Sequence, residues 1–269
     1  MLSSFNNVLR AYAAGDAFGV YYEFRDFKNV TREYRSPENW PYGGVSDDTF
    51  LTLMTLSALS EKTPEKAATK FLDDLRVAAP TLRGLGPTTR HALGMHVEER
   101  ELDYVGKSNG AMMRTALCGL AFSVNDANLR RSFVYALARA THTSDLAIKC
   151  SLIAAELFSN PYADISTIIL EEFPERKYWV PSAAGVSIDA LDTLFAFTLV
   201  AERNTKVLDA YVDACSLGGD TDTVCALSGA LVAFRNSDSD FEKIPWLGEI
   251  NWSEIPTLKI VAQQIKERN

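Results

Sequence analysis

Residues 218–234 read GGDTDTVCALSGALVAF, and the similar stretch at residues 43–59 reads GGVSDDTFLTLMTLSAL. Each begins with two glycines, continues with carboxylates and hydroxyls, and ends in an apolar run. In the second stretch, apolar side chains recur at three- and four-residue intervals, as at Leu51, Met54 and Ala58, which is the period of an α-helix. Both stretches therefore predict a helix whose first turn carries acidic side chains.

The same helical period runs through most of the chain. It covers the segments 3–14, 64–78, 88–99, 111–122, 128–140, 145–158, 191–198, 207–215 and 224–234, whereas period-two strands joined by hairpin turns are scarce. We therefore expect an all-α protein. The glycine and proline clusters at 36–44, 83–87 and 218–219 are too short to be flexible linkers, so a single domain over residues 1–269 is predicted.

Composition narrows the function classes. The 269 residues include 27 Lys and Arg against 35 Asp and Glu, and this net charge of −8 argues against non-specific nucleic-acid binding. The apolar runs are too short to span a bilayer, and the first residues lack the pattern of a secretory signal. We expect a cytoplasmic monomer without membrane association, in which the four cysteines are reduced core residues.

The acidic first turns have two interpretations. Ser46 or Asp220 can accept backbone N–H bonds as a helix cap, and acids suit the positive end of a helix dipole. If the two stretches fold together, however, Asp47, Asp48, Asp220 and Asp222 repel one another unless divalent cations neutralise them. Ligands that are all oxygen atoms favour Mg²⁺ or Mn²⁺ over zinc.

Five sequence blocks together resemble the ADP-ribosylglycohydrolase family, which includes dinitrogenase reductase-activating glycohydrolase. They are GDAFG at 15–19 with Glu23-Phe24, SDDT at 46–49, SNGAMMR at 108–114, Thr141-His142, and GGDTDT at 218–223. The resemblance covers about residues 3–232. It implies a compact orthogonal helical bundle with a two-metal cleft, and an enzyme that hydrolyses the C1″ glycosidic bond of ADP-ribose.

The resemblance also implies roles for individual residues. It assigns two Mg²⁺ or Mn²⁺ ions to Ser46, Asp47, Asp48, Asp220, Asp222 and Thr223. Glu23 and Asp48 are the expected catalytic residues, and Glu23 is expected to be partly buried among aromatic neighbours, although it can also be a solvated charge. The implied ADP-ribose contacts are Ser108, Asn109, Gly110, Met113, His142 and Gly219. By spacing alone, Asn109-Gly110 fits an ordinary turn and His142 fits a structural histidine equally well.

Two departures from the family pattern keep other functions open. Gly84 and Pro87 stand in a segment where many relatives carry an acidic residue, which leaves the general base open, and Val186 stands where an aromatic residue often contacts the ligand. The expected substrate is an ADP-ribosylated macromolecule or an ADP-ribose derivative, with arginine, serine, a nucleobase or an O-acetyl group as acceptor. The alternatives are a non-catalytic ADP-ribose-binding protein and a two-metal phosphohydrolase that acts on a diphosphate.

Overall fold

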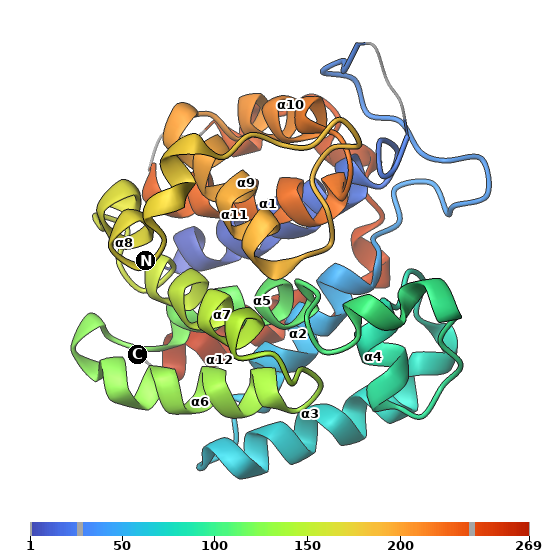
Figure 1. Cartoon of the computed structure of the whole chain (residues 1–269). Coiled ribbons are helices and arrows are strands. Elements are labelled where there is room, and N and C mark those ends of the chain that lie inside the picture. Colours follow the sequence, from blue (N-terminus) through green and yellow to red (C-terminus); the bar gives the residue numbers. More distant parts are fainter. Residues whose placement is uncertain (1, 26–28, 237–239, 269) are drawn as a thin grey trace. The chain divides into compact units, whose positions relative to one another are not determined.

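The structure is a computed structural model that describes residues 2–25, 29–236 and 240–268 (Figure 1). Over these residues the chain consists of α-helices and short 3₁₀ helices, with isolated bridges but no strand. The all-α prediction is confirmed. No helix in the described part of the chain is both long enough and apolar enough to cross a bilayer.

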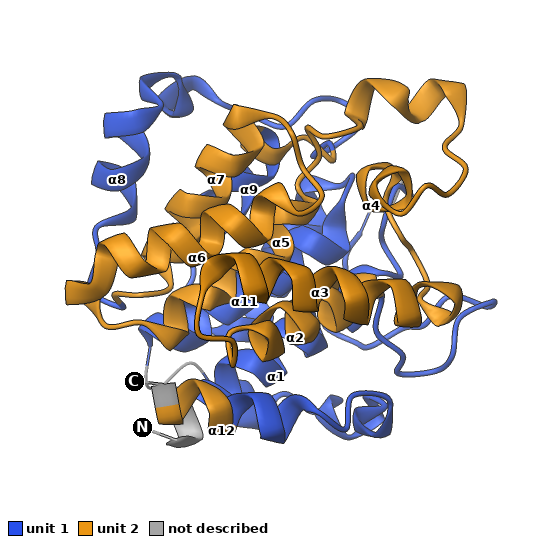
Figure 2. Cartoon of the chain, turned by 90° about the horizontal axis from the view of Figure 1, so that it is seen from below, with its two compact units in different colours: residues 1–46, 161–187, 192–262 blue, residues 47–160, 188–191, 263–269 orange. Residues whose placement is uncertain are grey.

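The α-helices begin and end at the following residues: α1 (Leu2–Gly19), α2 (Asp47–Ala58), α3 (Pro64–Ala78), α4 (Pro87–Ala92), α5 (Gly110–Thr115), α6 (Ala127–Arg139), α7 (Asp145–Leu157), α8 (Ile165–Glu172), α9 (Ala190–Arg203), α10 (Val207–Leu217), α11 (Thr221–Arg235) and α12 (Leu258–Arg268). The chain groups into two compact units (Figure 2). Unit 1 comprises residues 1–46, 161–187 and 192–262, and unit 2 comprises residues 47–160, 188–191 and 263–269. A single domain over residues 1–269 stays a prediction.

In unit 1, helices α1 and α11 pack side by side (Figure 1). Two glycines of α1 make this close approach possible. A Cβ atom on Gly15 would lie 2.6 Å from the carbonyl oxygen of Cys225, and one on Gly19 would lie 2.4 Å from the Cα of Asp222. The helix expected over residues 3–14 is therefore longer than predicted, because α1 continues through Gly19.

An aromatic cluster surrounds this helix pair. The ring of Phe18 stacks on Trp246 with 5.2 Å between the ring centroids, and on Tyr211 at 5.8 Å. The buried hydroxyl of Tyr211 donates a hydrogen bond to the carbonyl of Ala11. Buried aromatic pairs of this kind stabilise a core beyond the area that they bury, and they join α1 to α10 and to Trp246.

Unit 2 is built from helices α2 to α7. Helix α3 packs against α6, and α5 packs against both α2 and α7. Its core holds the guanidinium of Arg114, which is 1 % exposed. This group donates to the carbonyl of Leu137 at 2.7 Å and lies 4.1 Å over the ring of Phe71. Hydrogen bonds and a cation–π contact thus compensate for burial of the charge.

Several helix boundaries differ from the sequence-based expectation. The helix expected at 88–99 ends at Ala92, since Gly94 takes a φ of +70°, a conformation that ends an α-helix. The helix expected at 111–122 tightens into a 3₁₀ helix at Ala116–Ala121, where Gly119 packs directly on α7. Helices α8 and α12 were not predicted. The four cysteines are free and buried, as expected.

Candidate active site

Three carboxylates gather in unit 1, between the end of α1 and the start of α11. Glu23, Asp220 and Asp222 each place an oxygen within 4.8 Å of the other two, which is the spacing of groups that hold one cation. Asp220 and Asp222 are buried, and Glu23 is half-buried as expected. Burial raises the pKa of Asp222, although hydrogen bonds from its own neighbourhood oppose this rise.

The capping interpretation of these acids is wrong for Asp220. This residue occupies the N-cap position of α11 but makes no capping hydrogen bond with its side chain. At comparable positions the chain does use caps: Asp164 accepts the N–H of Thr167 at 3.0 Å, and Ser144 accepts the N–H of Ala147. Capping therefore does not explain the buried carboxylate of Asp220, whose side chain is hydrogen-bonded with that of Asp222.

The turn that precedes α11 is held by backbone hydrogen bonds. Val186 donates its N–H to the carbonyl of Gly218 and accepts the N–H of Asp220 at 2.9 Å. Gly219 has a φ of +79°, and a Cβ atom there would lie 2.0 Å from the carbonyl oxygen of Val186. Its carbonyl accepts the N–H of Phe24 at 2.8 Å. Packing alone therefore requires glycine at 219, and Val186 holds this turn with its backbone.

The acidic stretch at residues 43–59 is anchored by a residue that was not selected from the sequence. Asp16, which is fully buried in α1, accepts the backbone N–H of Ser46 at both carboxylate oxygens, at 3.0 and 3.1 Å. This bidentate acceptance fixes the end of the turn at residues 43–46. A single acid inside the apolar run Ala13–Phe18 was the signal that could have identified it.

Asp47 and Asp48 form the first turn of α2 in unit 2, and both are buried. The N–H of Asp47 donates to the carbonyl of Arg83 at 2.9 Å, so the loop at residues 83–86 holds the beginning of this helix. Thr223 of unit 1 is buried too, and its N–H donates to the Asp222 carboxylate at 2.8 Å. All six residues expected to hold metal therefore lie at or beside the start of α2 or α11.

The turn at residues 108–110 lies at the start of α5 and rests on His142. The N–H of Ala111 donates to Nε2 of His142 at 3.2 Å, and the hydroxyl of Ser108 lies 3.1 Å from the same nitrogen. Since Nε2 accepts, the proton is on Nδ1, which donates to the hydroxyl of Thr141 at 2.9 Å. Ser108, Asn109 and Met113 are largely buried.

His142 is 0 % exposed. Burial, reinforced by the nearby charge of Arg114, lowers the pKa of His142 to about 3, so its imidazole is neutral. Arg114 also donates to the Thr141 hydroxyl at 2.9 Å, which links the two groups through one oxygen. Both ring nitrogens of His142 have hydrogen-bond partners and none of the side chain is exposed to solvent. His142 therefore holds the turn at residues 108–110 in place from inside the protein.

Thr88 lies in the segment 84–90, where the family resemblance led us to look for an acidic residue, and its hydroxyl makes three hydrogen bonds. Its hydroxyl accepts the N–H of Gly106 and the O–H of Ser108, and donates to the carbonyl of Tyr104. Pro87 begins α4 in the position that suits proline. Through Thr88, the segment 84–90 therefore holds the backbone and side chains of residues 104–108 in place.

Comparisons with known proteins agree with this architecture. The sequence model of the ADP-ribosylglycohydrolase family matches residues 2–267, which extends beyond the 3–232 inferred from motifs and covers α12 except its last residue. A protein of Archaeoglobus fulgidus described as uncharacterized is 24% identical over 276 residues, with 86% of this chain and 87% of the other covered. A solved structure described as an ADP-ribosylglycohydrolase-related protein complex has the same fold, with a TM-score of 0.74, 24% identity, and coverage of 99% of this chain and 98% of that one. The chain belongs to the ADP-ribosylglycohydrolase family.

Proposed function

We propose that this protein is a Mg²⁺- or Mn²⁺-dependent hydrolase that cleaves the C1″ glycosidic bond between ADP-ribose and an acceptor. The observation that supports this most strongly is the cluster of half-buried Glu23 with buried Asp220 and Asp222, whose oxygens lie within 4.8 Å of one another. The substrate is an ADP-ribosylated macromolecule or a small ADP-ribose derivative. A monomeric state and a cytoplasmic location stay predictions.

The donor set fits a hard divalent cation. The cluster offers only oxygen atoms, and burial raises the pKa of Asp222, which is the effect that a nearby cation reverses. We propose that Asp220, Asp222 and Thr223 hold metal together with the residues Ser46, Asp47 and Asp48. When bound, two Mg²⁺ or Mn²⁺ ions supply Lewis-acid polarisation of the ribose hydroxyls and of water.

The chain's own residues then have separable tasks. Glu23 and Asp48 are the proposed proton-handling groups for the attacking water and the leaving group. Ser108, Asn109, Gly110 and Met113 are proposed to contact ADP-ribose, and Gly219 to border it. His142, being fully buried, contributes as a positioning residue that holds the 108–110 turn.

The test is release of ADP-ribose from arginine-, serine- and nucleobase-linked substrates, with Mg²⁺, with Mn²⁺ and with a chelator. We expect metal-dependent release, and a loss of about a hundredfold or more in Asp222→Asn, because that variant removes a ligand charge while keeping the side-chain shape. The matched control is Asp145→Asn, which removes an exposed acid from the first turn of α7 and should retain full activity.

The products separate this proposal from its alternatives. ADP-ribose as the released product supports glycosidic cleavage, whereas AMP with ribose phosphate identifies a phosphohydrolase acting on the diphosphate. Binding of free ADP-ribose measured by calorimetry, without release from any substrate of the panel, identifies a non-catalytic binder. An Asp222→Asn variant with full metal-dependent turnover contradicts the assigned metal site.

A further inference from the structure

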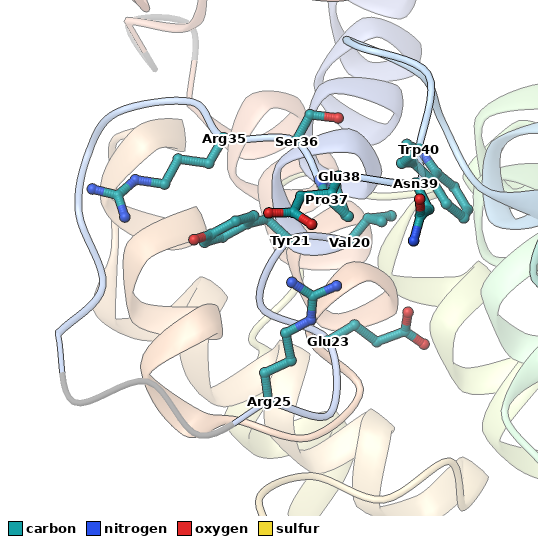
Figure 3. A pocket seen from close by; sticks show the side chains of 10 residues that line it. All are labelled: Val20, Tyr21, Glu23, Arg25, Arg35, Ser36, Pro37, Glu38, Asn39 and Trp40. Atoms are coloured by element: carbon teal, nitrogen blue, oxygen red, sulfur yellow. The ribbon is translucent and has the colours of Figure 1, made fainter.

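A pocket of about 770 Å³ in unit 1 adjoins the acidic cluster (Figure 3). Its walls come from Val20, Tyr21, Glu23 and Arg25, which follow the end of α1, and from residues 35–40 of the next loop. Glu23 lines this pocket and is also a member of the carboxylate cluster. A ligand group in the pocket therefore lies beside the proposed reaction centre.

Two arginines flank one aromatic ring of this pocket. The guanidinium carbons of Arg25 and Arg35 lie 5.6 and 5.8 Å from the ring centroid of Tyr21, and Figure 3 shows Tyr21 between the two side chains. A hydrogen bond to Tyr21 also raises the pKa of Arg35. Both arginines are exposed, and stacking on one ring restricts how far apart their charged ends can move.

Neither arginine has an ion-pair partner among residues 2–25, 29–236 and 240–268. Other arginines of the same unit do have partners: half-buried Arg10 pairs with Glu242, and exposed Arg32 pairs with Asp209. This is unusual for a chain with a net charge of −8, in which carboxylates outnumber basic side chains. Apart from the hydrogen bond of Arg35 to Tyr21, the donors of Arg25 and Arg35 are thus available to a ligand.

The charge of the pocket favours an anion. Glu23 and Glu38 are its acidic residues. If Glu23 binds a cation with Asp220 and Asp222, Arg25 and Arg35 outweigh Glu38 and the pocket is positive. A phosphate group offers several acceptor oxygens to the two guanidiniums, while an arginine acceptor would bring a third guanidinium beside them.

We propose that this pocket is the acceptor subsite and that it selects acceptors attached to C1″ through a phosphate, with Arg25 and Arg35 as the residues that determine this specificity. The inference rests on the proposed hydrolase function. In the reaction, the C1″–O bond to the phosphate breaks and the oxygen of water bonds to C1″. One proton of that water stays on the new hydroxyl and the other goes to the departing phosphate, so ADP-ribose and inorganic phosphate are the products.

The experiment compares two substrates, ADP-ribose carrying a phosphate on C1″ and ADP-ribosyl-arginine. It measures kcat/KM in the wild type, in Arg25→Gln, in Arg35→Gln and in the double variant. We expect the wild type to prefer the phosphate substrate. Each substitution should lower kcat/KM for that substrate by roughly tenfold while leaving the arginine-linked rate unchanged or higher, because a hydrogen bond from a charged donor to phosphate is lost.

Arg32→Gln is the matched control. It removes a guanidinium from the same loop, but Arg32 pairs with Asp209 and does not line the pocket, so both rates should stay at their wild-type values. Inorganic phosphate is a second probe: it should inhibit the wild type competitively, and more weakly the double variant. Melting temperatures of all variants confirm that they are folded.

Equal cleavage of the two substrates by the wild type, or a double variant that loses activity on both equally, overturns the specificity inference and leaves the hydrolase proposal standing. If neither these nor the serine- and nucleobase-linked substrates release ADP-ribose in the presence of metal, the hydrolase proposal itself fails, and the subsite assignment fails with it.

Discussion

Acidic residues of similar sequence context take different tasks in this protein. Asp164 caps its helix with its side chain, whereas Asp220 makes no such cap and joins Glu23 and Asp222 in a largely buried cluster. Asp16 accepts the N–H of Ser46 and so fixes the turn ahead of α2. The role of each aspartate depends on how deeply its carboxylate is buried and on which group it contacts, and the residue type determines neither.

His142 predicts a pH dependence of stability. Its pKa is about 3 in the folded protein against 6.5 ordinarily. Between these values the unfolded chain binds a proton that the folded chain does not, so the free energy of unfolding falls as the pH drops through this window, by at most about 1.4 kcal/mol per pH unit from this group. Denaturant unfolding at pH 7 and 4.5 measures it. His142→Asn should show a smaller difference between the two pH values, and an unchanged difference would contradict the assignment.

Among the helices, close approach matters more than local propensity. Gly15 and Gly19 are unfavourable inside a helix by propensity, but they let α1 lie against α11. This approach also sets the position of Asp222, whose Cα is the nearest atom to the missing Cβ of Gly19. The helix pair and the carboxylate cluster are therefore coupled.

Gly19→Ala tests this coupling. The added methyl would meet backbone atoms of α11, which cannot move aside as a flexible side chain can, so we expect a loss of roughly 1–3 kcal/mol in the free energy of unfolding and weaker binding of Mn²⁺. Gly248→Ala is the control, because a Cβ atom added to Gly248 would have no neighbouring atom within 4 Å. A Gly19→Ala variant with wild-type stability would show that α1 and α11 can separate at little energetic cost.

A substitution at Thr88 tests whether its hydrogen bonds stabilise the region of residues 104–110. Thr88→Val keeps the shape of the side chain but removes the oxygen that binds Gly106 and Ser108, leaving buried polar groups without that partner. We expect a loss of roughly 1–3 kcal/mol in stability and a higher Kd for ADP-ribose by calorimetry. Thr81→Val, at an exposed position of the same unit, should change neither quantity. Unchanged ADP-ribose affinity in a destabilised Thr88→Val variant would separate this region from ligand binding.

On the scale of the whole molecule, segments from both ends of the chain build the carboxylate cluster. Unit 1 combines residues 1–46 with residues 192–262, which brings Glu23 beside Asp220 and Asp222. Such an assembly forms only when the unit is folded. A cation that binds this cluster therefore binds the folded chain and not the unfolded one.

Divalent metal should for this reason raise the melting temperature. At a free Mg²⁺ or Mn²⁺ concentration of about 100 times Kd, linkage predicts roughly 2.7 kcal/mol of added stability, which corresponds to several degrees for a protein of this size. Thermal denaturation with metal and with chelator measures the shift, which Asp222→Asn should largely lose and Asp145→Asn should keep. An equal shift in both variants would place the stabilising cation elsewhere.

Local sequence patterns were sufficient to predict the helical class, most of the helices, the acidic turns and the family. Helical periodicity depends on neighbours three and four residues apart, and motif order is read directly along the chain. The tertiary structure alone decided that Glu23 joins Asp220 and Asp222, that Asp16 holds Ser46, that Gly15 and Gly19 lie inside a helix, and that His142 is buried behind a turn. Each of these depends on contacts between residues far apart in the sequence, which no local pattern encodes.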